Sequence, residues 1–328
     1  MRELSRLQTL SKTLDASLLE RLAEPNQLAL LGKFRGDKYL PEKVVLNSIL
    51  GNMKTKLTEG SASGYTLLDE MGKELGLVLA EKSNWDSEHF GMNLEKFTLS
   101  LFDPYVSVKD RMVLFQRVLQ ARRARMISTR VNTLDPGTVQ ALEQLGAILT
   151  DVLLTFRFDA GKPMPAIGNL KMEVGEADSS ETERLATMAE KVFRIDRFHN
   201  DPNLPSSKSD ALYGKWVFNS MRGLADAVLV ARKQEKIAGF ITCKIEQLGK
   251  GYRYGVIDLV GVNPSYQGQG VASRLVCASL EWFKHRAGPV YVGTQAANTR
   301  AIRLYEGTSF RHVSSEATLH LWPTNGLE

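Results

Sequence analysis

The sequence VIDLVGVNPSYQGQG at residues 256–270 is followed directly by VASRLVCASLEWF at residues 271–283. Its first seven residues are mostly β-branched or aliphatic and form too short a run for a helix, which predicts a largely buried strand ending at Asn263. After the glycines, apolar residues recur every three or four positions, which predicts an amphipathic helix starting near Gly270. We therefore expect a strand, a glycine-rich loop and a helix in succession.

The loop between strand and helix has a composition suited to anions. Gly268 and Gly270 have no side chains, so a ligand can approach the backbone, and several amide groups can converge at the helix N-terminus. Such an arrangement suits a pyrophosphate. It is not a Walker loop, because no Lys-Ser/Thr follows the glycines, and it is not a dinucleotide fingerprint, because Ser273 stands where the third glycine belongs.

The loop matches a known pattern, Gln/Arg-x-x-Gly-x-Gly/Ala after a strand ending in Val-x-Pro. The region therefore resembles motif A of the GNAT superfamily of acyl-CoA-dependent N-acetyltransferases. The resemblance implies acetyl-CoA as cosubstrate, with the strand backbone at Val260 and Val262 pairing with the pantetheine arm. It also implies that the pyrophosphate is held by the loop residues Gln267, Gly268, Gln269, Gly270, Val271, Ala272 and Ser273. A turn that serves only chain reversal is the alternative.

A second strand and helix follow the helix that begins near Gly270. Residues 290–294 read as a strand and residues 298–306 as a helix capped by Asn298. Asn at the cap with Tyr305 seven residues later is similar to motif B of the same family. The resemblance implies that Asn298 contacts the cofactor and that Tyr305 protonates the leaving thiolate as general acid. Tyr305 as a half-buried packing residue is the alternative.

Length and composition limit the remaining possibilities. A chain of 328 residues is expected to form two domains, and a net charge of +5 with dispersed basic residues indicates no nucleic-acid partner. Two cysteines, and histidines that show no HxxxH or HxH spacing, indicate no disulfide framework and no metal site. No run of about 18 apolar residues occurs, so we expect no membrane insertion and a cytoplasmic protein.

The order of the predicted elements divides the chain into three segments. We expect a helical extension of unknown role at 1–76, with a loop at 60–64, and a degenerate GNAT-like half domain at 77–162. A complete GNAT acetyl-CoA-binding catalytic domain is expected at 163–328. The predicted fold is α/β, a mixed sheet flanked by helices. Packing, partner docking and formation of a homodimer remain open roles for the extension.

A closer resemblance covers about residues 77–322. Trp85, Phe90, Arg197 and His199, together with the two motifs, are similar to the TDP-fucosamine acetyltransferase group. The resemblance implies a nucleotide-linked amino sugar as small-molecule substrate, used for surface polysaccharide. Trp85 and Phe90 would line its pocket, and Arg197 and His199 would pair with the diphosphate or the sugar hydroxyls. Core packing of the two aromatic residues and local anchoring of a loop by Arg197 and His199 are the alternatives.

The reaction also needs a base, since a sugar ammonium must lose a proton before its nitrogen attacks the thioester. Asp151 matches an acidic position of the resembled group and is preferred. Asp258 is the alternative because simple alternation places it on one face with Val260 and Val262, and Glu281 is expected to be solvated. A strand N–H near Val260 is expected to polarise the carbonyl.

Other functions remain compatible with the same motifs. Acetylation of a protein, a peptide or a small amine is one, since a fold does not specify its substrate. A non-catalytic regulator that binds acyl-CoA is another. The sequence leaves open which amine and which acyl chain are used.

Overall fold

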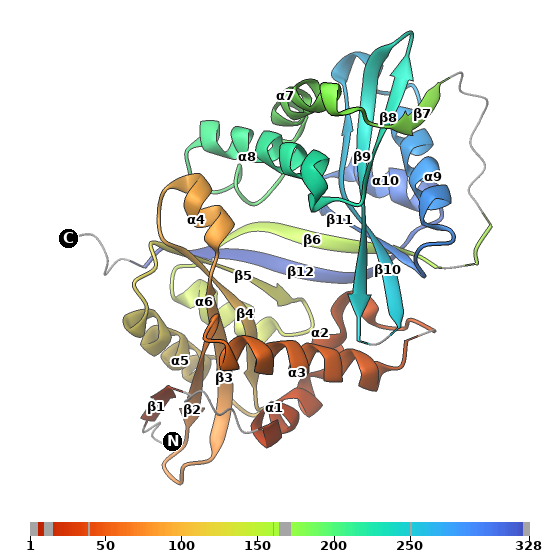
Figure 1. Ribbon diagram of the computed structural model, residues 1–328. Helices are drawn as coiled ribbons and strands as arrows, with labels where there is room; N and C mark the ends of the chain where they lie inside the picture. The colour runs from red at the N-terminus through yellow and green to blue at the C-terminus, as the bar shows by residue number, and fades with distance from the viewer. Residues whose placement is uncertain are drawn as a thin grey trace. The chain divides into compact units, whose positions relative to one another are not determined.

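The computed structural model describes residues 6–9, 16–38, 40–159, 161–163, 172–249 and 251–323 (Figure 1). The chain divides into two compact units: unit 1 comprises Met1–Val152 and Ser315–Glu328, and unit 2 comprises Leu153–Ser314. Both divisions fall within strands, β6 (Ile148–Phe158) and β12 (Arg311–Leu321). The compact units thus separate at a different place from the predicted boundary at 162–163, and residues 164–171, which follow that boundary, lie outside the described residues.

Unit 1 is a sheet with helices on both faces. Its strands follow the order β1-β2-β3-β4-β5-β12-β6, in which β4 and β5 are parallel. The other strands are β1 (Arg6–Thr9), β2 (Ala62–Leu68), β3 (Glu74–Lys82), β4 (Leu94–Phe102) and β5 (Met126–Asn132). The helices are α1 (Ala16–Ala23), α2 (Gln27–Leu31), α3 (Glu42–Thr58), α4 (Asn84–Phe90), α5 (Val108–Ala121) and α6 (Pro136–Gln144), with single 3-10 turns at Glu24–Asn26 and Gly32–Phe34.

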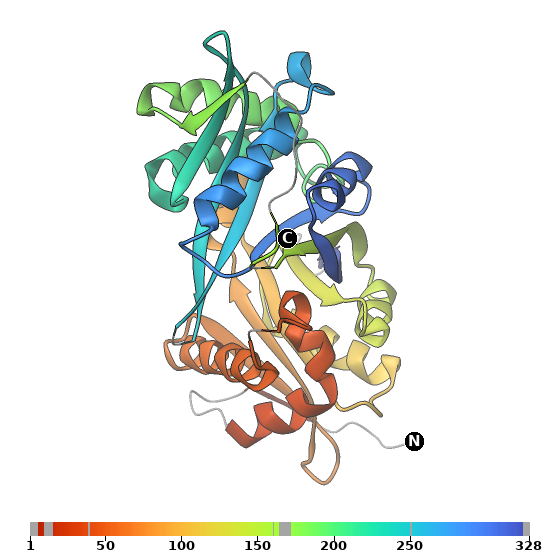
Figure 2. The same ribbon diagram turned by 90° about the vertical axis from the view of Figure 1, so that its right-hand side faces the viewer.

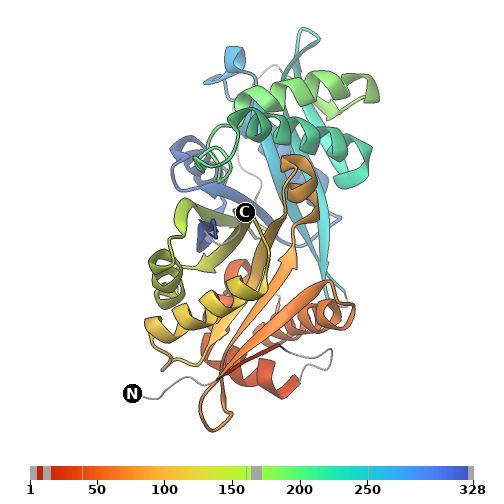
Figure 3. The same cartoon turned by 90° about the vertical axis from the view of Figure 1, so that its left-hand side faces the viewer.

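Alternation along β3 explains the two helical layers of unit 1. Leu77 and Leu79 pack with α1 and α3 in one core, whereas Val78 and Ala80 pack with α5 and α6 in another. Successive side chains of a strand point to opposite faces, so a run of apolar residues here predicts burial on both sides. Figure 2 shows the layer of α1 and α3, and Figure 3 shows α5 on the opposite face.

The helical extension is confirmed in part. Helices α1, α2 and α3 occupy much of 16–58, but the predicted loop at 60–64 is wrong because strand β2 begins at Ala62. The strand pairs along its length with β3, where Ala62 lies opposite Glu81 and Leu67 opposite Gly76. Pairing with a neighbouring strand, a long-range interaction, outweighs the local turn preference of glycine and serine.

Unit 2 has the mixed sheet that the sequence predicted. Its strands follow the order β6-β11-β10-β9-β8-β7, with β10 and β11 parallel. The strands not yet given are β7 (Glu173–Glu176), β8 (Ala227–Lys233), β9 (Lys236–Leu248), β10 (Tyr252–Val262) and β11 (Val290–Gln295). The helices are α7 (Thr182–Val192), α8 (Ser206–Asn219), α9 (Val271–Phe283) and α10 (Thr299–Gly307). The predicted α/β architecture, a mixed sheet flanked by helices, is confirmed.

Helix α9 covers one face of this sheet (Figure 2). Its predicted apolar side is buried, and Leu275, Val276, Leu280 and Phe283 join a core that also contains Ile257 of β10. Helices α7 and α8 cover the opposite face (Figure 3), where Phe193 contacts Phe240 of β9 with ring centroids 6.4 Å apart. Strand, loop and helix at 256–283 therefore form as predicted.

Two glycines of unit 2 give a matched test of this packing. A Cβ on Gly239 of β9 would lie 2.6 Å from the carbonyl oxygen of Gly261, a backbone atom that cannot rotate away. We expect Gly239→Ala to lower the free energy of unfolding by about 1–3 kcal/mol, as overpacking does. Gly307→Ala is the control, because no atom lies within 4 Å of its added Cβ. It should leave stability unchanged or raise it by up to about 1 kcal/mol. Urea unfolding measures both, and equal effects would contradict the packing.

Candidate active site

Strands β10 and β11 separate before either ends. Their parallel ladder ends at the pair Ile257 and Val292, although β10 continues to Val262 and β11 to Gln295. Along these last residues β10 still pairs with β9, and β11 still pairs with β6. Between these described segments, the two facing edges therefore make no ladder with each other. Such edges offer backbone N–H and C=O groups to an extended ligand, as in β-strand addition.

A β-bulge lies where the two strands separate. One extra residue of β10 stands between Ile257 and Val260 relative to β9, and the N–H of Leu259 donates to the Thr242 hydroxyl at 2.9 Å. Bulges bend a strand and increase its twist, which accounts for the departure of β10 from β11. The bulge was not predicted, because no short motif specifies it.

The bulge also corrects the argument for Asp258. Val260 and Val262 pack against the same core as Ile257, so alternation is broken between them. Asp258 directly follows Ile257 along the strand and does not share the face of Val260 and Val262 by simple alternation. The geometric reason for Asp258 as an alternative base is therefore wrong.

We call the stretch where β10 and β11 run without pairing with each other the open edge. The glycine loop lies at the end of this open edge, between β10 and α9. Gly268 and Gly270 have φ angles of +73° and +77°, in the left-handed region that favours glycine. A Cβ on Gly268 would meet no atom within 4 Å, so the backbone is accessible there. Gly270 is the N-cap of α9 and supplies no side-chain cap, which leaves the first-turn amides without carbonyl partners inside the helix. These amides and the helix dipole can hold an anion.

Two cations flank the loop. Lys233 at the end of β8 donates to the side-chain oxygen of Gln269 at 3.1 Å, and Arg300 of α10 donates to that of Gln267 at 3.3 Å. Both cationic side chains are exposed. The sequence singled out the glutamines but missed these cations, because they come from elements distant in sequence. Their positive charge adds to the attraction of this end of unit 2 for phosphates.

Tyr305 and Asn298 lie on α10 as predicted. Asn298 is the N-cap, and its side-chain oxygen accepts from the N–H of Ala301 at 3.2 Å. Tyr305 is 4% exposed, and its ring lies 5.8 Å from those of Phe156 and Phe310. Burial raises the pKa of the Tyr305 phenol far above its usual value, so it keeps its proton at neutral pH. Contact of either residue with a cofactor stays a prediction.

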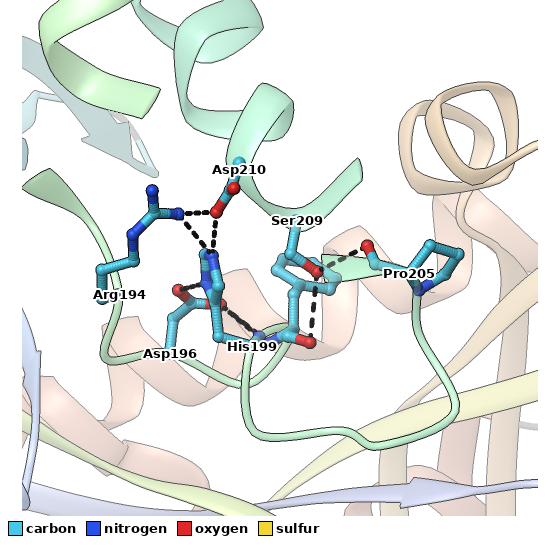
Figure 4. A network of polar contacts seen from close by, with 7 residues as sticks. Arg194, Asp196, His199, Pro205, Ser209 and Asp210 are labelled. Carbon is cyan, nitrogen blue, oxygen red and sulfur yellow. Dashed lines mark hydrogen bonds and ion pairs between the residues drawn. The ribbon is translucent and has the colours of Figure 1, made fainter. Parts of the chain in front are cut away.

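The segment joining α7 and α8 carries a polar network (Figure 4). The imidazole of His199 lies between two carboxylates, with Nδ1 2.5 Å from Asp196 and Nε2 2.8 Å from Asp210, and Arg194 also pairs with Asp210. The Arg197 guanidinium lies 4.4 Å from the centre of the Phe198 ring. For His199 these contacts favour the anchoring role over direct contact with a substrate phosphate.

The remaining predicted residues lie in surroundings of different kinds. Trp85 and Phe90 lie on helix α4 of unit 1, and Gly91 ends that helix with a φ of +69°. Phe90 is 1% exposed, as a packing residue would be, whereas Trp85 is half-buried. Asp151 on β6 is 8% exposed, and Glu281 of α9 is exposed beside Lys284. The substrate roles of Trp85 and Phe90 and the base role of Asp151 stay predictions, whereas the exposure of Glu281 agrees with the expected solvation.

Three further properties concern the described residues alone. None of the described helices is both long enough and apolar enough to span a membrane. In the same parts of the chain, no group of three or more His, Cys, Asp or Glu residues could hold a metal ion. Cys243 and Cys277 are both buried outside any disulfide, and burial raises the pKa of both thiols, which keeps them protonated at neutral pH.

The separated strands, the glycine loop and the helix after it define a class of acyl-CoA-binding transferase. Residues 192–310 match the model of the acetyltransferase (GNAT) family, so the chain contains a GNAT acetyltransferase domain. A GCN5-related N-acetyltransferase from Sphaerobacter thermophilus has the same fold over 98% of both chains, with a TM-score of 0.61 at 15% identity. The resemblance inferred from the two motifs is thus confirmed at the level of the domain and the fold.

Two relatives of known name resemble the chain in sequence. The spore coat polysaccharide biosynthesis protein SpsD of Bacillus subtilis is 26% identical over 265 residues, which cover 78% of this chain and 87% of that protein. A mycothiol acetyltransferase of Brachybacterium faecium is 30% identical over 182 residues, or 53% of each chain. The chain therefore spans most of the first relative and about half of the second.

Proposed function

We propose that the protein acetylates the amino group of a nucleotide-linked amino-deoxy sugar, using acetyl-CoA, in the biosynthesis of a surface polysaccharide. The open edge between β10 and β11, which continues into the glycine loop, is the observation that carries the transferase part. The named role of the relative in spore coat polysaccharide biosynthesis supports the sugar part. The closer resemblance to TDP-fucosamine acetyltransferases supports TDP as the nucleotide.

The residues present fit acetyl-CoA. The edge of β10 from Val260 to Val262 would pair with the amide groups of the pantetheine arm, and the amides from Gly268 to Ser273 would hold the pyrophosphate. Lys233 and Arg300 would add positive charge beside it. When bound, acetyl-CoA supplies an acetyl thioester that an amine can attack.

Groups of the chain itself would stabilise the developing charge and transfer the protons of the reaction. A backbone N–H near Val260 would donate to the carbonyl oxygen as negative charge develops there. Tyr305 would donate its phenolic proton to the departing sulfur, a role that its raised pKa supports because the acid form persists at neutral pH. Asp151, the preferred base, would accept one proton of the acceptor ammonium through water, and the second proton that the nitrogen loses as the amide forms would restore the Tyr305 phenol.

A second candidate acceptor is supported by the other relative. Its name, mycothiol acetyltransferase, does not mention a nucleotide sugar, and we take a small amine as the second candidate acceptor. A peptide acceptor and a non-catalytic acyl-CoA-binding role remain alternatives from the sequence. These possibilities differ in the acceptor, so they share the same prediction for the glycine loop.

A panel of acceptors tests the proposal. Release of thiol from acetyl-CoA is measured with a TDP-4-amino-4,6-dideoxyhexose, with free amino sugars and with peptides. We expect turnover with the nucleotide sugar at a kcat/KM at least about tenfold above any other acceptor, a discrimination of about 1.4 kcal/mol. Preference for a free amino sugar or a peptide would reject the nucleotide sugar. Binding of acetyl-CoA without release from any amine would favour the regulator.

A further inference from the structure

Four residues join the chain segment before α8 to α8 itself (Figure 4). We call Arg194, Asp196, His199 and Asp210 the His199 clamp. Asp196 and His199 lie in the segment from 194 to 205, and Asp210 lies in the first half of α8. His199 makes contacts of 2.5 Å to Asp196 and 2.8 Å to Asp210, and Asp196 is 2% exposed. The clamp is thus a bridge between a loop and a helix that is buried at Asp196 and partly exposed at Arg194 and Asp210.

The imidazole of His199 is held on both sides. Its Nδ1 faces Asp196, and its Nε2 lies 2.8 Å from a carboxylate oxygen of Asp210 and 3.3 Å from the Arg194 guanidinium. Arg194 also pairs with Asp210, so the clamp places a cation beside the carboxylate from α8. The ring of Tyr213, 6.3 Å away, is the aromatic neighbour on α8.

The same segment is tied down at further points. One carboxylate oxygen of Asp196 accepts from the N–H of Phe198 at 2.8 Å and from that of His199 at 3.2 Å. The buried hydroxyl of Ser209 on α8 lies 3.2 Å from the carbonyl oxygen of Phe198 and 3.4 Å from that of Pro205. The conformation of the segment therefore depends on Asp196 and on α8 together.

Aromatic contacts connect this segment to the open edge of β10. Phe240 packs against Gly261 so closely that a Cβ there would lie 2.5 Å from its ring. Phe193, the residue before the clamp begins, contacts Phe240 at 6.4 Å and stacks on Tyr213 at 4.6 Å. The rings of Phe193 and Phe240 lie on the face of the sheet opposite α9. The clamp thus fixes a segment that starts beside the strand proposed to hold the acyl donor.

We propose that the His199 clamp is a positioning device for the acceptor amine: it holds the segment 194–205 in the conformation that binds the acceptor beside β10. The inference rests on the proposed function and adds the part of unit 2 that determines acceptor affinity. Loss of the clamp should therefore raise the KM for the acceptor and leave the KM for acetyl-CoA unchanged.

Two substitutions of Asp196 separate charge from hydrogen bonding. Asp196→Ala removes the acceptor of two backbone amides and of Nδ1, and we expect the acceptor KM to rise about tenfold or more. Asp196→Asn can keep every bond, since its oxygen accepts the amides and its NH₂ donates to a neutral imidazole whose other nitrogen donates to Asp210. We expect its acceptor KM to stay within about threefold of the wild type. Glu281→Gln, an exposed carboxylate on α9, is the control.

Hydrogen exchange tests the clamp without substrate. Exchange at the backbone amides of residues 196–204 should be faster in Asp196→Ala and unchanged in Asp196→Asn. Equal exchange in Asp196→Ala and the wild type, or an unchanged acceptor KM in Asp196→Ala, would overturn the proposal. If the wild type acetylates no amine, the proposed function and the acceptor role fail together, and hydrogen exchange still decides whether the clamp exists.

Discussion

Replacing Tyr305 with phenylalanine is expected to lower kcat for acetyl transfer by about 10²–10⁴-fold, the usual contribution of a positioned general acid. The phenol is buried between Phe156 and Phe310, and Phe preserves the ring that makes these contacts. The KM for acetyl-CoA should change little, because the hydroxyl acts as charge develops on the sulfur rather than in the ground state. Initial rates at saturating acceptor measure the effect.

Tyr254→Phe is the matched control for this variant. Tyr254 is also a buried tyrosine of unit 2, at 8% exposure, and burial raises its pKa to about 12. It lies on β10 before the bulge and has no proposed role, so its loss should leave kcat within about twofold. Equal rates for Tyr305→Phe and the wild type would assign Tyr305 to packing, the alternative that its burial also allows.

The pH dependence follows from the direction of the Tyr305 shift. An acid acts in its protonated form, and burial moves the pKa of Tyr305 upward from the usual value of about 10. Its deprotonation therefore limits the rate only above about pH 10, and Tyr305→Phe should not remove any alkaline decline seen below that pH. An alkaline limb at about pH 8–9 that disappears in Tyr305→Phe would contradict the raised pKa.

Gly268→Val should have the largest effect on binding of acetyl-CoA. In the protein alone, a Cβ at Gly268 meets nothing within 4 Å, so the added side chain would occupy the space that a pyrophosphate needs. Loss of one charge-assisted hydrogen bond of about 1.5–3 kcal/mol corresponds to a rise in Kd of about 10–150-fold. Isothermal titration with acetyl-CoA or CoA measures it without any acceptor.

Backbone strain must be separated from this loss of binding. Valine at a φ of +73° costs about 1–2 kcal/mol wherever it occurs. Gly60, in the turn before β2, has the same φ of +73° and the same open space around it. Gly60→Val should therefore lower the melting temperature as much as Gly268→Val does and leave the Kd unchanged. A similar rise in Kd for both variants would mean that the loop does not bind the cofactor.

The strand, loop and helix at 256–283 could be predicted because their signals are local. Apolar periodicity, Pro264 after the strand and the glycines at 268 and 270 each specify backbone conformation within a few residues. The cap at Asn298 is equally local, since its side chain bonds to an amide three residues later. A family motif built on such signals identifies the cofactor loop before any tertiary contact is known.

The features that the sequence did not predict have a different origin. Strand β2 forms at Ala62–Leu68 because β3 supplies its hydrogen-bonding partner. The bulge in β10 is visible only against the register of β9. Asp196, three residues before His199, was the one local signal for the clamp. The second carboxylate that contacts His199 belongs to Asp210 of α8, which is more distant in sequence.

Local sequence pattern was thus sufficient for the order of elements in unit 2, for the loop conformation and for the position of Tyr305 on its helix. Three features depend on contacts between residues far apart in the chain: the separation of β10 from β11, the burial that raises the pKa of Tyr305, and the pairing of His199 with two carboxylates. The physical reason is that periodicity and capping act within a turn or two of backbone. Strand register, desolvation and ion pairing are determined by what the folded chain places opposite each residue.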